Sequence, residues 1–319
     1  MYNTQRDIFI SELHQIARKD PNVIMISVDM GAPSLDAWRE ELPEQFFAGG
    51  ISEQNSINFA AGLAAEGKKV YVYAMSCWAA RCLEQLRYSC AMARLPITFL
   101  GNGVGLGYAP AGPAHCATDD IGYLRTINGI EIISPANLHI IKPLVELSYN
   151  RPRLRVFRLE RTMAPEVKDC YPQSEEKDVS LGYSLLYSSR PRPFANSIAI
   201  ASSGYMLGRA MRVASLLSST YDVSVVDVFK IKPLNPLCIH RIAVMHDYFV
   251  TIEEQTLCGG FGSALAEAII DANFPHKIPI LRLGLPPRYI FENGNREQLL
   301  DNNRLSVDDI HQNILKFVK

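Results

Sequence analysis

Short runs of β-branched and aromatic residues alternate with amphipathic stretches along most of this chain, and this alternation restricts the folds open to it. Five such runs precede residue 160, at 22–29, 68–75, 96–102, 130–134 and 153–159. Strands separated by helix-length connections pair in parallel, because a parallel crossover needs a dozen or so residues. The sequence therefore predicts an α/β fold, in which mostly parallel sheets are covered by helices on both faces.

The alternation stops after Arg161 and resumes near residue 196. Residues 164–180 are charged, contain two prolines and have few large aliphatic side chains, which is typical of a linker. At 319 residues the chain exceeds the ~250–300 residues at which a single core stops growing. We therefore expect two domains, 1–165 and 196–319, joined by a linker over 166–195.

Composition and charge exclude several classes of partner. Lys and Arg number 32 against 33 Asp and Glu, so no overall field attracts nucleic acid or an anionic membrane. No segment approaches the ~18 uninterrupted apolar residues of a membrane span, and the amino terminus has no apolar signal core. The seven cysteines form no C-x-x-C pair and are odd in number, which suits a reducing compartment. We expect a cytoplasmic protein.

Residues 46–69 are predicted to be a loop that leads into a helix with an acid in its first turn. Ser52 is suited to cap this helix, and a carboxylate at Glu53 is favoured there by about 0.3–1 kcal/mol through the helix dipole. From the local pattern alone, this structural role for Glu53 is favoured over a functional one. The buried face is predicted at the three- and four-residue steps Ile57, Ala60, Ala61 and Ala64.

Two glycine-rich segments invite ligand-binding interpretations. The run 101–112 fails the G-x-G-x-x-G fingerprint in every register, and the chain has no Walker A loop and no zinc-like spacing of His and Cys. We expect these glycines to let the backbone pass close to a ligand or a neighbouring subunit. The second segment, CGGFG at 258–262, precedes a helix and favours close packing over an anion site.

One histidine and two arginines remain as candidates on the pattern alone. His115 follows a Gly-Pro turn, where a structural imidazole is more common than a catalytic one. Arg158 and Arg161 lie at and just after the end of a predicted strand, the edge at which α/β proteins bind ligands. Paired arginines there suit a phosphate or carboxylate, although surface ion pairs fit equally well.

Several blocks, in this order, resemble the pyrimidine-binding and carboxy-terminal domains of the transketolase family. They are GGISEQNSINFAAGLAAEG, YAMSCWAARCLEQLR, GPAHCATDDI, ISPAN, FRLER and TIEEQTLCGGFGSALAEAI. The similarity extends from about Gln5 to Gly294 and is closest to the carboxy-terminal subunit of a split transketolase. It implies a thiamine diphosphate pyrimidine-binding domain over 1–165 and a transketolase C-terminal domain over 196–319.

The resemblance assigns Glu53 a catalytic role. The family's matching glutamate hydrogen-bonds the aminopyrimidine ring of thiamine diphosphate and activates the cofactor. Trp78 matches an aromatic residue that stacks on that ring, and Met75 stands where many members have a second aromatic residue. Arg81 matches a substrate arginine of deoxyxylulose-phosphate synthases, and we group it with the cofactor-binding residues. For Trp78 and Met75 the alternative is a place in the core.

The resemblance also implies a phosphorylated substrate. Arg6, Ser27 and Arg158 match positions that hold a sugar phosphate, and we group Arg161 with them. His115 matches a histidine that faces the reacting donor and is the second predicted catalytic residue. Two departures leave the sugar open: the family aspartate that reads a substrate hydroxyl is Ala111 here, and Gly103 lies near the place of a substrate histidine.

The chain lacks the family's other half. It contains no GDG with a downstream Asn, the element that binds Mg²⁺ and the diphosphate, so no metal ligand is predicted here. The resemblance therefore implies a diphosphate-binding partner subunit, an α2β2 assembly and ketol transfer between sugar phosphates. Three alternatives stay open: a 2-oxoacid dehydrogenase β subunit, a deoxyxylulose-phosphate-synthase-like carboligase, and a noncatalytic scaffold subunit.

Overall fold

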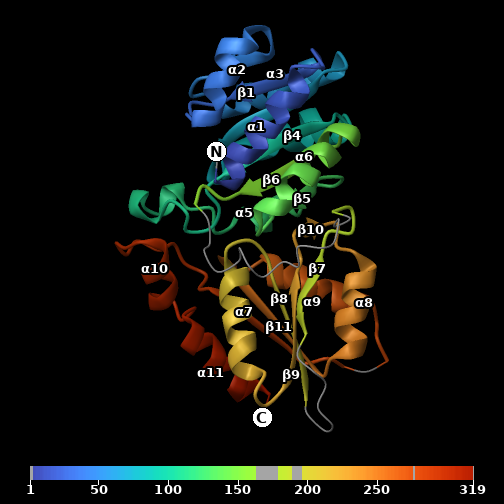
Figure 1. Cartoon of the computed structure of the whole chain (residues 1–319), viewed down its shortest axis with the longest axis vertical. Helices are drawn as coiled ribbons and strands as arrows, with labels where there is room; N and C mark the ends of the chain where they lie inside the picture. Colours follow the sequence, from blue (N-terminus) through green and yellow to red (C-terminus); the bar gives the residue numbers. More distant parts are fainter. Residues whose placement is uncertain (1–2, 163–178, 189–195, 276, 319) are drawn as a thin grey trace.

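The structure, a computed structural model, describes residues 3–162, 179–188, 196–275 and 277–318. Two sheets are stacked along the long axis of the molecule, the amino-terminal one above the carboxy-terminal one in Figure 1. No helix among these residues is long and apolar enough to cross a membrane.

The first sheet has seven strands in the order β10-β5-β6-β4-β3-β1-β2. All neighbours are parallel except β10, which pairs antiparallel with β5. The strands are β1 (Val23–Ser27), β2 (Phe46–Ala48), β3 (Lys69–Met75), β4 (Ile97–Asn102), β5 (Glu131–Ile133), β6 (Arg155–Leu159) and β10 (Lys230–Lys232). The five strands predicted in this half are confirmed, whereas β2 lies where a loop was expected.

Helices cover both faces of this sheet because its strands are apolar on both sides. Alternate residues of β1 enter different cores: Ile24 and Ile26 join one apolar cluster, Val23 and Met25 the other. The second cluster takes the apolar side of α1 and α6, and the first takes that of α3 and α5. The helices of this half are α1 (Gln5–Ala17), α2 (Asp36–Glu41), α3 (Glu53–Ala65), α4 (Leu83–Gln85), α5 (Asp120–Leu124) and α6 (Ile141–Asn150).

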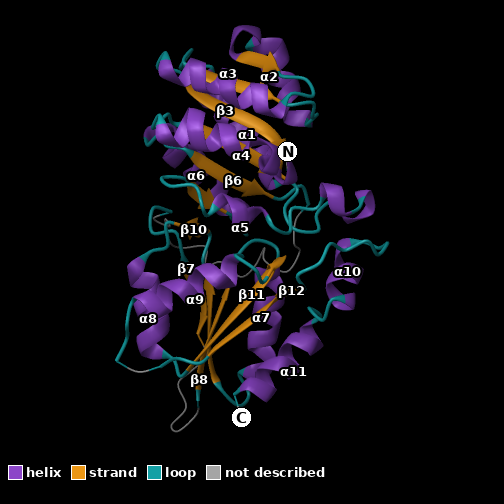
Figure 2. Ribbon diagram, turned by 180° about the vertical axis from the view of Figure 1, so that it is seen from behind, coloured by secondary structure: helices purple, strands orange, loops and turns teal. Residues whose placement is uncertain are grey.

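The second sheet has five strands in the order β12-β11-β8-β9-β7, with only β7 antiparallel. Helices again lie on both faces, as Figure 2 shows, so the predicted α/β architecture holds for both domains. The strands are β7 (Ser184–Ser188), β8 (Ser197–Ser202), β9 (Asp222–Asp227), β11 (Tyr248–Thr256) and β12 (Ile280–Leu285). The helices are α7 (Met206–Leu217), α8 (Pro236–Met245), α9 (Phe261–Asp271), α10 (Arg296–Asn302) and α11 (Val307–Phe317).

The two halves are joined more closely than the predicted domain limits suggest. β7 lies inside the range 166–195 expected to be a linker, although most of that range falls outside the described residues. β10 belongs by sequence to the second half but completes the first sheet. One apolar cluster also contains Val72 of the first sheet and Phe249 of the second. The domains therefore share a strand and a core.

Candidate functional site

Glu53 is the first residue of α3 and is buried, with 3% of its surface exposed. The chain reaches it from β2 through the turn 49–52, and α3 then packs its predicted apolar face on the sheet. Ser52 occupies the position before the helix, but its hydroxyl donates to the Gly49 carbonyl at 2.5 Å. The predicted side-chain cap is therefore wrong, because the hydroxyl closes the preceding turn instead.

The Glu53 carboxylate has one nearby cation and one unused oxygen. Arg81 Nη1 donates to Oε1 at 3.3 Å and lies 3.2 Å from Oε2 without hydrogen-bonding it. Oε2 is buried and has no hydrogen-bond partner among the described residues. A buried carboxylate oxygen without a donor is unfavourable unless a ligand supplies one, because its lost hydration is not replaced. Glu53 Oε2 is thus suited to accept a hydrogen bond from a ligand N–H, including that of a protonated ring nitrogen.

The predicted aromatic wall follows β3. Met75 ends this strand and is 4% exposed, whereas Trp78 lies in the 3₁₀ segment η3 (Ser76–Cys82) and is half-buried against the core. Arg81 belongs to the same segment, which packs against α3. The structure therefore brings Glu53, Arg81 and the segment with Trp78 together at one edge of the sheet. Met75 is a core residue.

His115 lies in a long connection after β4, residues 103–118, which we call the His115 loop. The loop is closed at its base by two hydrogen bonds between Gly105 and Ala117, at 3.0 and 2.9 Å. The imidazole is half-buried, and its Nδ1 has no hydrogen-bond partner among the described residues. Within the described part of the chain, no hydrogen bond or ion pair joins His115 to Glu53.

The glycines of this loop are used by the chain itself. Gly103 has φ +75°, and a side chain there would overlap the Tyr108 ring. Gly105 has φ +55°, and a side chain there would overlap the Glu254 carboxylate from the second domain. Gly103 and Gly105 therefore let the backbone approach Tyr108 and the second domain of the same chain, whereas the predicted approach to a ligand or a neighbouring subunit remains a prediction.

The two arginines of β6 and its end have different environments. Arg158 is buried: Nε and Nη2 donate to Asp120 at 2.7 and 3.0 Å, and Nη1 donates to Ser134 at 3.0 Å. The prediction that Arg158 holds a phosphate is therefore not supported, because an equally buried carboxylate already occupies its guanidinium. Arg161 lies beyond the strand, is exposed, and stacks over the Tyr108 ring at 4.4 Å.

The pairing of Arg158 with Asp120 yields a first prediction, on stability. Replacing Arg158 by alanine leaves the Asp120 carboxylate, 1% exposed, without its cation, and should lower the free energy of unfolding by about 3–5 kcal/mol. Denaturant unfolding monitored by circular dichroism measures this change. Arg153→Ala is the matched control, since Arg153 is exposed and its guanidinium lies 3.8 Å from the Glu131 carboxylate. Equal stability of the two variants would contradict a structural role for Arg158.

The other predicted phosphate residues gather near the carboxyl edge of the first sheet. Arg6, at the start of α1, donates to Asp7 at 2.7 Å, and its backbone N–H reaches the Glu160 carbonyl at 3.4 Å. Burial alone would raise the pKa of Asp7, but hydrogen bonds from Arg6, Thr4 and Ser34 hold it below its usual value. Ser27 ends β1 and donates to the Met30 carbonyl at 2.8 Å. Arg6 and Ser27 therefore already have partners within the chain.

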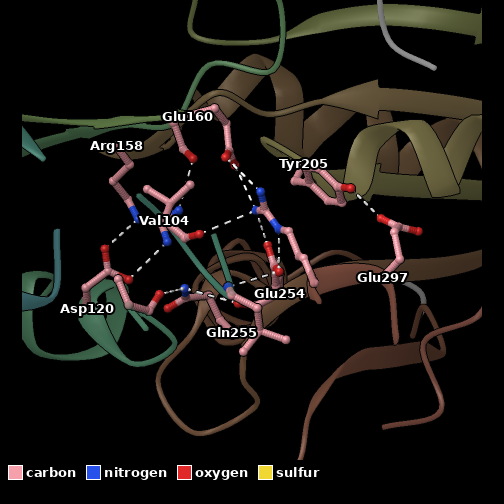
Figure 3. Close-up of polar contacts among 12 residues, drawn as sticks. Val104, Asp120, Arg158, Glu160, Tyr205, Glu254, Gln255 and Glu297 are labelled. Atoms are coloured by element: carbon pink, nitrogen blue, oxygen red, sulfur yellow. Dashed lines mark hydrogen bonds and ion pairs between the residues drawn. The ribbon is translucent and has the colours of Figure 1, made fainter. Parts of the chain in front are cut away.

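Sequence reasoning missed a buried charge cluster between the domains, drawn in Figure 3. Arg296 of α10 donates to Glu160 at 2.8 and 2.9 Å and to Glu254 at 2.7 Å, and it stacks on Tyr205 at 3.5 Å. Next to it Glu253 accepts hydrogen bonds from two α9 backbone amides at 2.6 and 2.8 Å. Burial nevertheless raises the pKa of Glu253 to about 7.

Glu253 also explains the second glycine-rich segment. Side chains at Gly260 and Gly262 would overlap its carboxylate, so the glycines allow close packing and an internal acid fills the helix start. Close packing was the favoured prediction, and it is correct. A signal for the missed cluster was present in the sequence, since Glu253, Glu254 and Gln255 lie near the end of a strand whose earlier residues are mostly apolar.

Metal ligands do not gather in this chain as far as it is described. In residues 3–162, 179–188, 196–275 and 277–318, no three side chains of His, Cys, Asp or Glu lie close enough together to hold a metal ion.

Two family models match this chain. Residues 3–166 match the transketolase pyrimidine-binding domain, and residues 188–310 match the transketolase C-terminal domain. Together the two matches cover most of the sequence.

Curated relatives fall into two lengths. The chain is 32% identical to 1-deoxy-D-xylulose-5-phosphate synthase of Histophilus somni (strain 2336), over 99% of this chain but 49% of that protein. It is 27% identical to one subunit of the apulose-4-phosphate transketolase of Phocaeicola vulgatus, over 98% of this chain and 97% of that subunit. The chain thus spans about half the length of the synthase and almost all of the transketolase subunit.

Solved structures show the same fold. One described as a split gene transketolase, inactive beta4 tetramer, has a TM-score of 0.81 at 23% identity and covers 98% of this chain and 97% of its own. The transketolase of Campylobacter jejuni has a TM-score of 0.78 at 16% identity, with 98% of this chain covered and 46% of its own.

Proposed function

The chain belongs to the transketolase family, and on that premise we propose that it is one subunit of a two-component transketolase. The complete enzyme would use thiamine diphosphate to move a two-carbon ketol unit between sugar phosphates. The observation that carries this proposal is the buried Glu53 carboxylate, whose Oε2 lacks a donor at the family's activating position. Similarity to a transketolase subunit along nearly its full length supports the two-component form.

Glu53 would hold the pyrimidine end of the cofactor. Its Oε2 would share a proton with a ring nitrogen, and the surrounding apolar side chains would exclude water from that bond. Bound thiamine diphosphate would supply the carbon nucleophile for cleavage of the donor sugar. Trp78, half-buried, would offer a ring face beside this site, and Arg81 would remain close to the carboxylate.

His115 would act on the donor sugar. The residue is half-buried, and its Nδ1, itself a buried atom, has no partner in the described structure, which leaves the imidazole free to hold or move a proton on a donor hydroxyl. Catalysis by a positioned general acid or base contributes typically ~10²–10⁴-fold in rate.

Arg161 would be the main phosphate residue. Arg6, with a side chain 15% exposed, and Ser27 would add to it although each already has a partner within the chain, whereas the more deeply buried Arg158 would not take part. Arg161 is the strongest candidate among them, because it is exposed, lies past the end of β6, and among the described residues contacts Tyr108 rather than a carboxylate. Arg6 is pre-oriented by Asp7, and Ser27 lies at the end of β1 on the same edge.

A second prediction tests this phosphate site. Arg161→Ala should raise KM for a phosphorylated sugar by about 10–100-fold, the equivalent of about 1.5–3 kcal/mol for a charged hydrogen bond, and leave KM for the unphosphorylated sugar unchanged. Steady-state kinetics of the reconstituted enzyme measure both constants. Arg153→Ala should change neither. An equal rise for both sugars in Arg161→Ala would exclude phosphate recognition by this residue.

The partner would dock on the side of the molecule where α3 begins. Exposed apolar side chains lie on β2, on the turn before α3, on α3 and on the π-helical segment η4 (Leu86–Met92), which packs against α3, and Phe47 packs edge-on against Phe59. They are Phe47, Ile51, Phe59, Tyr88 and Met92. A patch of this kind suits a permanent interface. We infer that the partner contributes Mg²⁺ and the diphosphate site, and that the assembly is α2β2.

Two finer points complete the proposal. The described cysteines are all free thiols, which supports a cytoplasmic location. The higher identity to synthases favours one alternative product, a deoxyxylulose phosphate, and product analysis of the reconstituted enzyme separates the two. Transfer of a ketol unit between sugar phosphates supports the transketolase. Formation of 1-deoxy-D-xylulose 5-phosphate would replace it with the synthase activity.

A further inference from the structure

Among the described residues, the His115 loop makes more hydrogen bonds to the second domain than to β4, the strand that precedes it. Gln255 Nε2 donates to the Ala117 carbonyl at 2.7 Å, and the Thr256 amide donates to the Thr118 carbonyl at 2.8 Å. Both residues end β11, so the loop's carboxyl side is held by a strand of the other sheet. Ala117 is two residues from His115.

The other side of the loop is held by the charge cluster. The Leu106 amide donates to Glu254 Oε1 at 3.0 Å, and Arg296 Nη2 donates to the Val104 carbonyl at 3.4 Å. Figure 3 shows Val104, Glu254 and Gln255 next to one another in this arrangement. The φ of +55° at Gly105, and the absence of a side chain there, let the loop lie directly on the Glu254 carboxylate.

We propose that Glu254 and Gln255 are positioning residues, which set the place of His115 by holding both sides of its loop from the second domain. This inference rests on the proposed role of His115. The carboxy-terminal domain would then affect the reaction by positioning His115, although none of its own side chains would contact the reacting atoms. Displacement of a catalytic group by about 1 Å is enough to reduce turnover by about 10²-fold.

The variant that tests this idea is Gln255→Met. Methionine keeps the length of the side chain and removes the N–H that donates to Ala117. It also removes the side-chain oxygen of Gln255, but this oxygen has no partner in the described structure. The Ala117 carbonyl keeps its bond from Gly105, so the fold should be retained. Glu267→Ala is the matched control, because it breaks the ion pair to Arg125 between the same two domains without touching the loop.

Hydrogen exchange of the full chain gives the first readout. In Gln255→Met the amides of Gly105 and Ala117 should exchange about tenfold faster, while amides of β3 and β4 stay unchanged. Glu267→Ala should leave the exchange of the loop as in the wild type. Unchanged exchange in Gln255→Met, or equal acceleration in both variants, would overturn the proposal.

A double-mutant cycle on the reconstituted enzyme gives the second readout. Gln255→Met should lower kcat with a phosphorylated ketose donor by about 10–100-fold with little change in KM, and should have no further effect when His115 is alanine. An equal loss on both backgrounds would overturn the proposal. If His115→Ala alone leaves turnover normal, the proposed role of His115 fails, and exchange still decides whether Gln255 holds the loop.

Discussion

Glu53→Gln should lower the turnover of the reconstituted enzyme by about 10³–10⁴-fold. Glutamine keeps the size and most of the hydrogen-bonding capacity of the side chain, but it cannot take or return a proton at Oε2. Stability should change by no more than about 1 kcal/mol, because the lost partner, Arg81, is 58% exposed and such pairs contribute little. Steady-state kinetics and denaturant unfolding of the same preparations separate the two effects.

Glu66→Gln is the control for this variant. Glu66 follows the last turn of the same helix and is exposed, so the change of charge and composition is identical but lies away from the site. We expect wild-type turnover for Glu66→Gln. Wild-type turnover in Glu53→Gln as well would remove Glu53 from the mechanism.

The chain alone should bind thiamine diphosphate only weakly and should transfer no ketol unit. The sequence has no GDG with a downstream Asn, and a single aromatic platform contributes a few kcal/mol at best, which corresponds to a Kd of about 1 mM. Isothermal titration with cofactor and Mg²⁺, first of the chain and then of the chain with a diphosphate-binding subunit, measures the difference. Tight binding and transfer by the 319-residue chain alone would refute the two-component proposal.

The apolar patch beside α3 allows a test of where the partner subunit docks. Ile51→Asp places a charge at the most exposed apolar residue of that patch and should prevent the partner from restoring activity, since a buried unpaired charge costs several kcal/mol. Leu216→Asp introduces the same charge at an exposed leucine of α7, in the second domain, and should assemble normally. Equal assembly of both variants, measured by analytical ultracentrifugation, would show that the interface does not include this patch.

The strands were predictable wherever a run of β-branched residues was long enough to be buried on both faces. β3 and β4 are such runs, and both lie where the pattern places them. β7 and β10 have five and three residues, lie at sheet edges, and carry polar residues. Their pairing is decided by strands far away in the sequence. For this reason the region that contains β7 was predicted to be a linker.

The site residues remain predictions, and their pairings within the chain could not be read from the sequence. A pattern places Arg158 and Arg161 near a strand end, yet it does not reveal that Arg158 turns toward Asp120, 38 positions earlier. The Arg296 cluster joins residues 42 and 136 positions apart, so no local spacing announces it. Only the polar residues near the end of β11 indicated contacts between the second domain and the first.

The antiparallel strand β10 has a consequence for dissecting the protein. A fragment ending near residue 165 contains every strand of the first sheet except Lys230–Lys232. It would expose the backbone of β5 along one edge, and it would lose the ammonium of Lys232, which donates to the Arg125 and Ile127 carbonyls at 2.6 Å. An open edge of buried, apolar sequence is a template for pairing between molecules. Such a fragment should therefore aggregate. A truncated or fused version of this chain should retain residues 230–232, so that β10 can still pair with β5.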